Sequence, residues 1–238
     1  MLEKLMVDFY VNLKCEFSGL DTYEYCQNKK YFTNFPHKID YVFNSRGFRD
    51  EEWPTENLEN AIWCFGDSFT TGLGSPYDHM WTQVLQKKTN RRTINISMDG
   101  ASNSWITRKA LSVFREVKPK DVVIFWTYFH RREVDDKMLS DIQRRLKVRG
   151  RETLEDDILN FEWCFNAIEN NKGDINVIYL TVPYPMQENK SLYTRDAKNF
   201  LGEVTVLDYA RDYHHFDIIT SNCIVDKIIP LLTNQNLP

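Results

Sequence analysis

Short apolar runs alternate with helix-patterned segments from residue 61 to the end of the sequence. The apolar runs predict five strands, at residues 61–65, 93–97, 121–126, 175–181 and 204–207. Apolar residues at helical spacing predict helices at residues 80–88, 104–117, 135–148, 154–170, 196–201 and 217–232. Because short apolar strands that alternate with helices form a parallel sheet covered on both faces, we expect an α/β protein. The expected architecture is a three-layer α/β/α sandwich around a mainly parallel sheet of about five strands.

The N-terminal region does not share this alternation, and it is rich in tyrosine and phenylalanine. We therefore divide the chain into residues 1–58 and residues 59–238, the second being the sandwich. One interpretation is that the first segment is an arm or small subdomain that packs on the sandwich through its rings. The other is that the rings form a substrate or partner surface near a functional site. The rings are those of Phe17, Tyr23, Tyr25, Tyr31, Phe32, Phe35, Tyr41 and Phe43.

The first predicted strand ends abruptly in Gly66-Asp67-Ser68, which indicates a strand-to-helix turn. A serine at the carboxyl edge of a parallel sheet, with its N–H at the start of a helix, can attack a carbonyl group. The N–H groups of the same turn can stabilise the oxyanion that results. The alternative is a tight turn in which Asp67 or Ser68 does no more than cap the helix.

A second polar motif, Asp212-Tyr213-His214-His215, lies just before the last predicted helix. A serine is a poor nucleophile near neutral pH unless a base, usually a histidine oriented by a carboxylate, takes its proton. Asp212 and His215 are three residues apart in a predicted turn, so both side chains can point the same way. His215 can then reach Ser68 across the edge of the sheet.

Other assignments of these polar residues are open from the residues alone. The two adjacent histidines could lie solvated in a surface loop, or His214 could be the base instead of His215. His130 follows the third predicted strand, but it has no carboxylate at the same spacing. A metal site from His214, His215 and Asp217 is disfavoured, because adjacent residues do not easily share one ion.

The sequence resembles the SGNH (GDSL-like) hydrolase family from about residue 40 to about residue 235. The first family block matches at residues 66–70, followed by Gly72 and Gly74, and the last block matches at residues 212–215. A candidate second block lies at residues 95–104, and residues 44–49 resemble an Asn-x-x-Gly-Phe-Arg element that precedes the first strand. The resemblance implies a flavodoxin-like strand order.

The resemblance also implies a site. Ser68 would be the nucleophile, His215 the general base and Asp212 the orienting carboxylate. The backbone N–H groups of Ser68 and Gly100 would form the oxyanion hole.

One departure from the family pattern bears on this oxyanion hole. The third block usually supplies an asparagine in a Gly-x-Asn-Asp motif, whereas here residues 127–133 contain no asparagine. We expect Asn103 to replace it, with the Thr127 hydroxyl or Arg131 as other substitutes. The alternative for Asn103 is a cap on the helix that begins at Ser104. The residues expected to line the substrate site are Asp67, Thr127, His130, Arg131 and Arg49.

The expected function is hydrolysis of a carboxylic ester through an acyl-enzyme, without a metal or organic cofactor. The substrate would be a small-molecule or glycan ester, and the family implies an acetyl or short acyl ester on a carbohydrate. A lipid ester or a thioester is an open alternative. An acyltransferase with the same triad is an alternative. A binding protein that kept the fold and lost the chemistry is another, because the third-block asparagine is missing.

Composition and charge narrow the possible partners and the compartment of the protein. The chain has 238 residues and a net charge of −4 without a basic stripe, which argues against nucleic acid as a partner. The N-terminus does not have the pattern of a secretory signal, and the longest apolar run is too short to span a membrane. The five cysteines are scattered along the sequence and show no disulfide pattern, so we expect the protein to lie in the reducing cytoplasm. Nothing in the sequence indicates an oligomeric state.

Overall fold

The computed structural model describes residues 2, 5–27, 30–133, 153–183 and 199–233. Its centre is a parallel sheet in which the strand order is β4-β3-β5-β6-β7. The strands are β3 (Ile62–Gly66), β4 (Thr93–Ser97), β5 (Asp121–Trp126), β6 (Asn176–Thr181) and β7 (Phe200–Glu203). Counted along the chain, the order is second, first, third, fourth and fifth, which is the flavodoxin-like order. The strand that follows β3 in the chain lies on one side of it, and all later strands lie on the other side. The topological switch point is therefore between β3 and β5.

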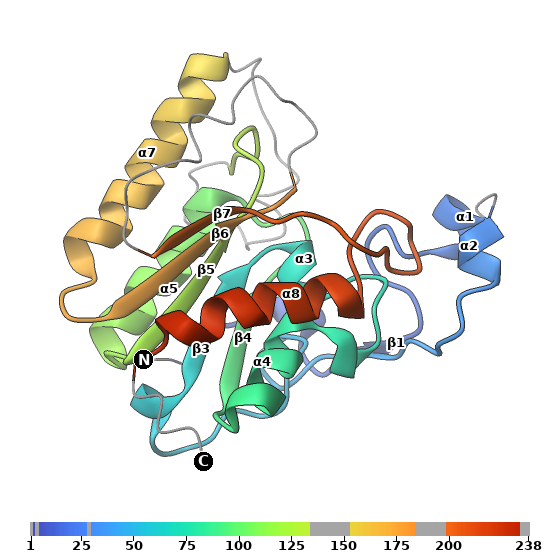
Figure 1. Ribbon diagram of the computed structural model, residues 1–238, viewed down its shortest axis with the longest axis horizontal. Helices are drawn as coiled ribbons and strands as arrows, with labels where there is room; N and C mark the ends of the chain where they lie inside the picture. Colours follow the sequence, from blue (N-terminus) through green and yellow to red (C-terminus); the bar gives the residue numbers. More distant parts are fainter. Residues whose placement is uncertain (1, 3–4, 28–29, 134–152, 184–198, 234–238) are drawn as a thin grey trace.

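Helices cover both faces of this sheet (Figure 1). Helices α5 and α7 pack on one face, and α4 and α8 pack on the other. Alternate residues along β3 serve the two layers, since Trp63 belongs to the first core and Cys64 to the second. The predicted three-layer α/β/α sandwich is confirmed. The helices of the sandwich are α3 (Ser68–Thr71), α4 (Trp81–Thr89), α5 (Asn103–Glu116), α7 (Leu154–Asn171) and α8 (Ile218–Ile228).

Most predicted elements lie within one or two residues of the observed ones, but the last strand is wrong. It was expected at residues 204–207, and the structure places β7 at Phe200–Glu203, where the sequence predicted the end of a helix. All four β7 residues are only half-buried at the sheet edge, so their apolar pattern is weak. The helix expected at residues 135–148 lies outside the described residues.

The N-terminal region packs on the layer that contains α5 and α7. Strands β1 (Lys14–Cys15) and β2 (Tyr41–Val42) pair antiparallel. The short helices α1 (Tyr23–Cys26) and α2 (Lys30–Thr33) lie beside the loop that precedes α8 (Figure 1). The buried side chains of the N-terminal region join the larger core, and they include Leu5, Val7, Ile39, Tyr41, Phe43 and Phe48. Short 3-10 helices occupy Asp8–Tyr10, Leu58–Asn60, Tyr77–His79 and Ile229–Leu231. In the parts of the chain described, no helix is both long and apolar enough to cross a membrane.

Arg49 connects the N-terminal region to the turn that follows α3. Its side chain is fully buried, and its guanidinium donates to the carbonyl oxygens of Thr71, Gly72 and Ser75. The guanidinium also lies 4.3 Å from the centre of the Tyr41 ring. The sequence leaves two roles open for Arg49, anchoring its loop by a salt bridge or lining the substrate site. The structure shows an anchor, made through carbonyl groups beneath the turn instead of through a salt bridge. The carbonyl oxygens of this turn supply the hydrogen-bond acceptors that a buried guanidinium requires.

Replacing Arg49 by methionine should lower the free energy of unfolding by about 2–4 kcal/mol, because buried carbonyl groups lose their donors. Urea denaturation measures this loss. Arg115→Met is the matched control, since Arg115 is exposed on α5 and should change stability by less than about 0.5 kcal/mol. Equal effects of the two substitutions would contradict the anchoring role of Arg49.

Candidate active site

The end of β3 determines where Ser68 lies. Asp67 is the N-cap of α3, and its Oδ1 accepts a hydrogen bond from the Phe69 N–H at 3.0 Å. Gly66 is needed just before it, because a Cβ there would lie 2.0 Å from Thr70 Oγ1. The capping role that the sequence allowed for Asp67 is therefore present. It places Ser68 as the first residue of α3, at the carboxyl edge of the sheet.

Ser68, His215 and Asp212 lie together in a hydrogen-bonded row. The Ser68 Oγ is 2.8 Å from His215 Nε2, and His215 Nδ1 is 2.5 Å from Asp212 Oδ2. Because an ionised carboxylate only accepts hydrogen bonds, Nδ1 carries the proton and Nε2 accepts from the serine hydroxyl. Ser68 and His215 are each 2% exposed, and Asp212 is fully buried. The distance between Ser68 Oγ and His215 Nε2 lies within the range for proton transfer.

The environment of Asp212 keeps its carboxyl group ionised. Burial alone would raise its pKa, but the hydrogen bond and charge of His215 and two backbone N–H groups hold the pKa below its usual value. Those N–H groups belong to His214 and His215, and both donate to Oδ1 at 3.0 Å. The carboxylate also packs on Gly74, where a Cβ would lie 3.1 Å from Oδ1. The Asp212 carboxylate is thus held by His215, by two backbone N–H groups and by its packing on Gly74.

The loop around Asp212 presents only one of its two histidines to Ser68. Tyr213 has a φ of +55°, a left-handed conformation that bulky residues rarely adopt. The N–H of Tyr213 donates to the Ala210 carbonyl, which closes a turn at 2.9 Å. As a result His215 points inward, while His214 is exposed. The third member of the disfavoured metal site, Asp217, is 2.8 Å from His79 Nδ1.

The two backbone N–H groups expected to form the oxyanion hole lie in turns at the same edge of the sheet. Ser68 itself begins α3, and Gly100 lies in the turn after β4 with a φ of +68°, which favours glycine. Strand β4 pairs with β3 as far as Gly66 and Ser97, so both turns leave the same edge of the sheet. Neither N–H donates to an acceptor within the described ranges. The oxyanion roles of Ser68 and Gly100 remain predictions.

Asn103 is used for a structural link. Its Oδ1 accepts from the Thr127 N–H at 2.9 Å, and its Nδ2 donates to the Thr127 carbonyl at 3.2 Å. The N-cap of α5 is Ser102, whose hydroxyl accepts from Trp105 N–H, so the capping alternative for Asn103 is wrong. Asn103 instead fastens the start of α5 to the end of β5. Its role as an oxyanion donor is still a prediction.

Asp67, Thr127 and Arg131 form a buried group at the switch between β3 and β5. Asp67 Oδ2 accepts from the Thr127 hydroxyl at 2.6 Å and from the Arg131 guanidinium at 2.5 Å. Asp67 and Thr127 are fully buried, and the Arg131 side chain is 22% exposed. His130 is exposed and stacks on Tyr128, with 5.6 Å between ring centres. Substrate contacts of these residues are untested predictions.

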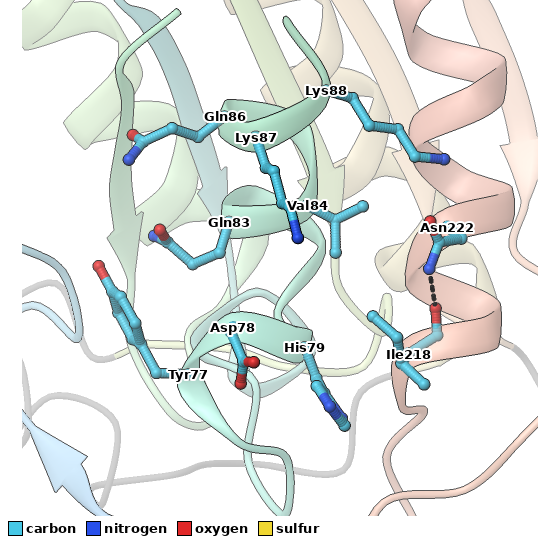
Figure 2. Close-up of a pocket in the computed structure, with 10 residues that line it drawn as sticks. All are labelled: Tyr77, Asp78, His79, Gln83, Val84, Gln86, Lys87, Lys88, Ile218 and Asn222. Atoms are coloured by element: carbon cyan, nitrogen blue, oxygen red, sulfur yellow. Dashed lines mark hydrogen bonds between the residues drawn. The ribbon is translucent and has the colours of Figure 1, made fainter. Parts of the chain in front are cut away.

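A separate surface pocket of about 690 Å³ lies between α4 and α8. Figure 2 shows Lys87 and Val84 of α4 facing Ile218 and Asn222 of α8 across it. None of Ser68, Asp212 and His215 lines this pocket. The pocket is therefore distinct from the candidate active site.

Comparison with known proteins supports the fold. No protein-family model matches the sequence, and no curated protein matches it. A family two carbohydrate esterase from Clostridium thermocellum, solved in complex with cellohexaose, is similar with a TM-score of 0.51. The identity is 13%, and the match covers 75% of this chain and 65% of that chain.

Two further structures are similar at 15% identity. A putative lipolytic protein of the G-D-S-L family from Desulfitobacterium hafniense DCB-2 gives a TM-score of 0.46, covering 73% of this chain and 99% of that chain. Esterase EstA from Pseudoalteromonas sp., inhibited by monoethylphosphonate, gives a TM-score of 0.48, and the match covers 72% of this chain and 95% of that chain. The chain has the SGNH hydrolase fold.

Asn103→Ala should lower the free energy of unfolding by about 2 kcal/mol, because the buried N–H and carbonyl of Thr127 lose their partners. Urea denaturation and turnover per folded molecule, measured on the same variant, separate the two roles. A fall in turnover of about tenfold or more, with the Michaelis constant within a few-fold, would support the oxyanion role. Unchanged stability would contradict the structural link.

The lowered pKa of Asp212 predicts a specific pH dependence of stability. A carboxyl group whose folded pKa lies below its unfolded value of about 3.9 stabilises the protein above that value and stops doing so as it becomes protonated. Asp212→Asn should therefore be less stable than the wild type near neutral pH, and the difference should shrink as the pH falls below about 4. Urea denaturation across this range measures it, and a constant difference would contradict the prediction.

Proposed function

We propose that the protein is a serine hydrolase that cleaves carboxylic esters. The observation that carries the proposal is the hydrogen-bonded row of Ser68, His215 and Asp212, with 2.8 Å and 2.5 Å between the interacting atoms. The row lies where β3 ends, at the carboxyl edge of a parallel sheet, where open α/β folds bind their ligands. The similarity in fold to a carbohydrate esterase is consistent with this chemistry.

In the first half of the reaction, Ser68 Oγ attacks the ester carbonyl carbon while His215 Nε2 takes the hydroxyl proton. Asp212 stabilises the imidazolium that forms and keeps the ring oriented. Negative charge develops on the carbonyl oxygen, and the N–H groups of Ser68 and Gly100 donate to it. His215 then protonates the departing alcohol, which leaves an acyl group on Ser68.

In the second half, water attacks the acyl carbon and gives its proton to His215. The tetrahedral intermediate collapses, the carboxylic acid leaves, and His215 returns the proton to Ser68. Ser68 and His215 are almost inaccessible in the free protein, which favours a small acyl group over a bulky one. We therefore propose an acetyl or other short acyl ester, on a carbohydrate or another small alcohol.

Ser68→Ala should abolish hydrolysis of p-nitrophenyl acetate and labelling by a fluorophosphonate probe. His215→Ala should reduce hydrolysis strongly, and Asp212→Asn should cost less, because the carboxylate acts through the imidazole. Ser45→Ala is the matched control, since that hydroxyl bonds Glu52 on the surface and should not alter turnover.

Hydrolysis by the Ser68→Ala protein at the wild-type rate would refute the proposal. Absence of phosphonate labelling in the folded wild-type protein would favour a non-catalytic binding protein. Faster acyl transfer to an added sugar alcohol than to water would instead indicate an acyltransferase with the same triad.

A further inference from the structure

A second buried carboxylate lies behind the candidate active site. Asp21, in the N-terminal region, is fully buried and binds Arg211, the residue immediately before Asp212. Arg211 Nε is 2.9 Å from Asp21 Oδ1, and its second terminal nitrogen is 2.7 Å from Oδ2. Such a two-point contact between a planar guanidinium and a carboxylate fixes direction as well as distance.

The same carboxylate reaches the turn that follows Ser68. The Tyr41 hydroxyl donates to Asp21 Oδ2 at 2.6 Å and accepts from the Gly74 N–H at 2.7 Å. The Gly74 carbonyl in turn accepts from the Arg211 N–H at 2.8 Å. Asp21 is thus joined to both sides of the site, through Tyr41 on the serine side and through Arg211 on the Asp212 side.

The contact between these two sides leaves little freedom. Gly74 packs against Ala210 and Asp212, where an added Cβ would lie 2.9 Å and 3.1 Å from the nearest atoms. A change in the position of residue 211 therefore moves Asp212 relative to the turn that carries Ser68. Reacting groups that are misplaced by about 1 Å can lose about a hundredfold in rate.

We infer that Asp21 is a positioning residue, which sets the distance between Ser68 and the Asp212–His215 pair by holding Arg211 and Tyr41. The inference rests on the proposed function of these three residues. Asp21 touches none of the reacting atoms, so its effect should appear in the chemical step and not in substrate affinity. Neither Asp21 nor Tyr41 belongs to the motifs that the sequence analysis matched.

The chain provides a close control in Asp50. This carboxylate is also buried, and it binds Arg92 through two contacts of 3.0 Å each. It connects the N-terminal region to β4, since its Oδ2 also accepts from the Asn95 N–H at 3.1 Å, and it does not contact the Asp212 loop. Burial raises the pKa of Asp50 to about 7, so measurements near pH 8 keep it charged.

The experiment compares Asp21→Asn with Asp50→Asn in the full chain. Hydrolysis of p-nitrophenyl acetate gives kcat and KM, and the downfield NMR signal of the His215 Nδ1 proton reports its bond to Asp212. We expect Asp21→Asn to lower kcat by about tenfold or more with KM within about threefold, and to shift the proton signal. Asp50→Asn should lower stability and leave kcat and the proton signal as in the wild type.

Wild-type kcat per folded molecule and an unmoved proton signal in Asp21→Asn would overturn the inference, as would equal losses of kcat in both variants. If Asp21→Asn does not fold, Tyr41→Phe and Arg211→Lys each break one arm of the network and should move the same signal. The NMR comparison does not depend on turnover. A wild-type protein that is not labelled by the phosphonate probe would refute the proposed function and leave the positioning role testable.

Discussion

Two buried charges hold the turns at the carboxyl edge of the sheet, and the geometry of the site depends on them. Arg49 binds the carbonyl groups after α3, and Asp21 binds Arg211 beside Asp212. A buried charge that loses its partner costs several kcal/mol, so each pair strongly favours a single arrangement. Both charges come from the N-terminal region, which therefore determines the shape of a site whose reacting groups lie elsewhere.

The sequence predicted the central strands and the closeness of Ser68, His215 and Asp212, for different physical reasons. Strands β4 and β5 are buried on both faces, so their apolar runs have sharp limits. Ser68 and His215 stand in local motifs whose spacing is tied to chemistry. Asp21 has no such pattern, because its partner is 190 residues away. Asn103 was expected to face the substrate, and no pattern could reveal that its amide matches the backbone of Thr127.

Two aspartates next to the site are kept apart by their partners. Asp67 precedes Ser68 and is held by Arg131 and Thr127, while Asp212 is held by His215 and backbone N–H groups. Only Asp212 faces an imidazole, so only this carboxylate can stabilise a positive charge that forms on the base. The positive charge of Arg131 offsets the negative charge of Asp67. This limits the repulsion between the Asp67 carboxylate and an oxyanion beside Ser68.

The link between Asp21 and Arg211 has a consequence for how the chain is made. Residue 21 leaves the ribosome long before residue 211, so during most of synthesis its carboxylate lacks the cation that it binds in the folded protein. The contact closes a loop of 190 residues, and closing so long a loop costs more conformational entropy than closing a short one. The contacts of Arg49 need no such wait, since their partners lie at most 26 residues along the chain. Ser68 likewise waits for His215, which lies 147 residues further along the chain, so the row of Ser68, His215 and Asp212 is complete only after the last segment has been made.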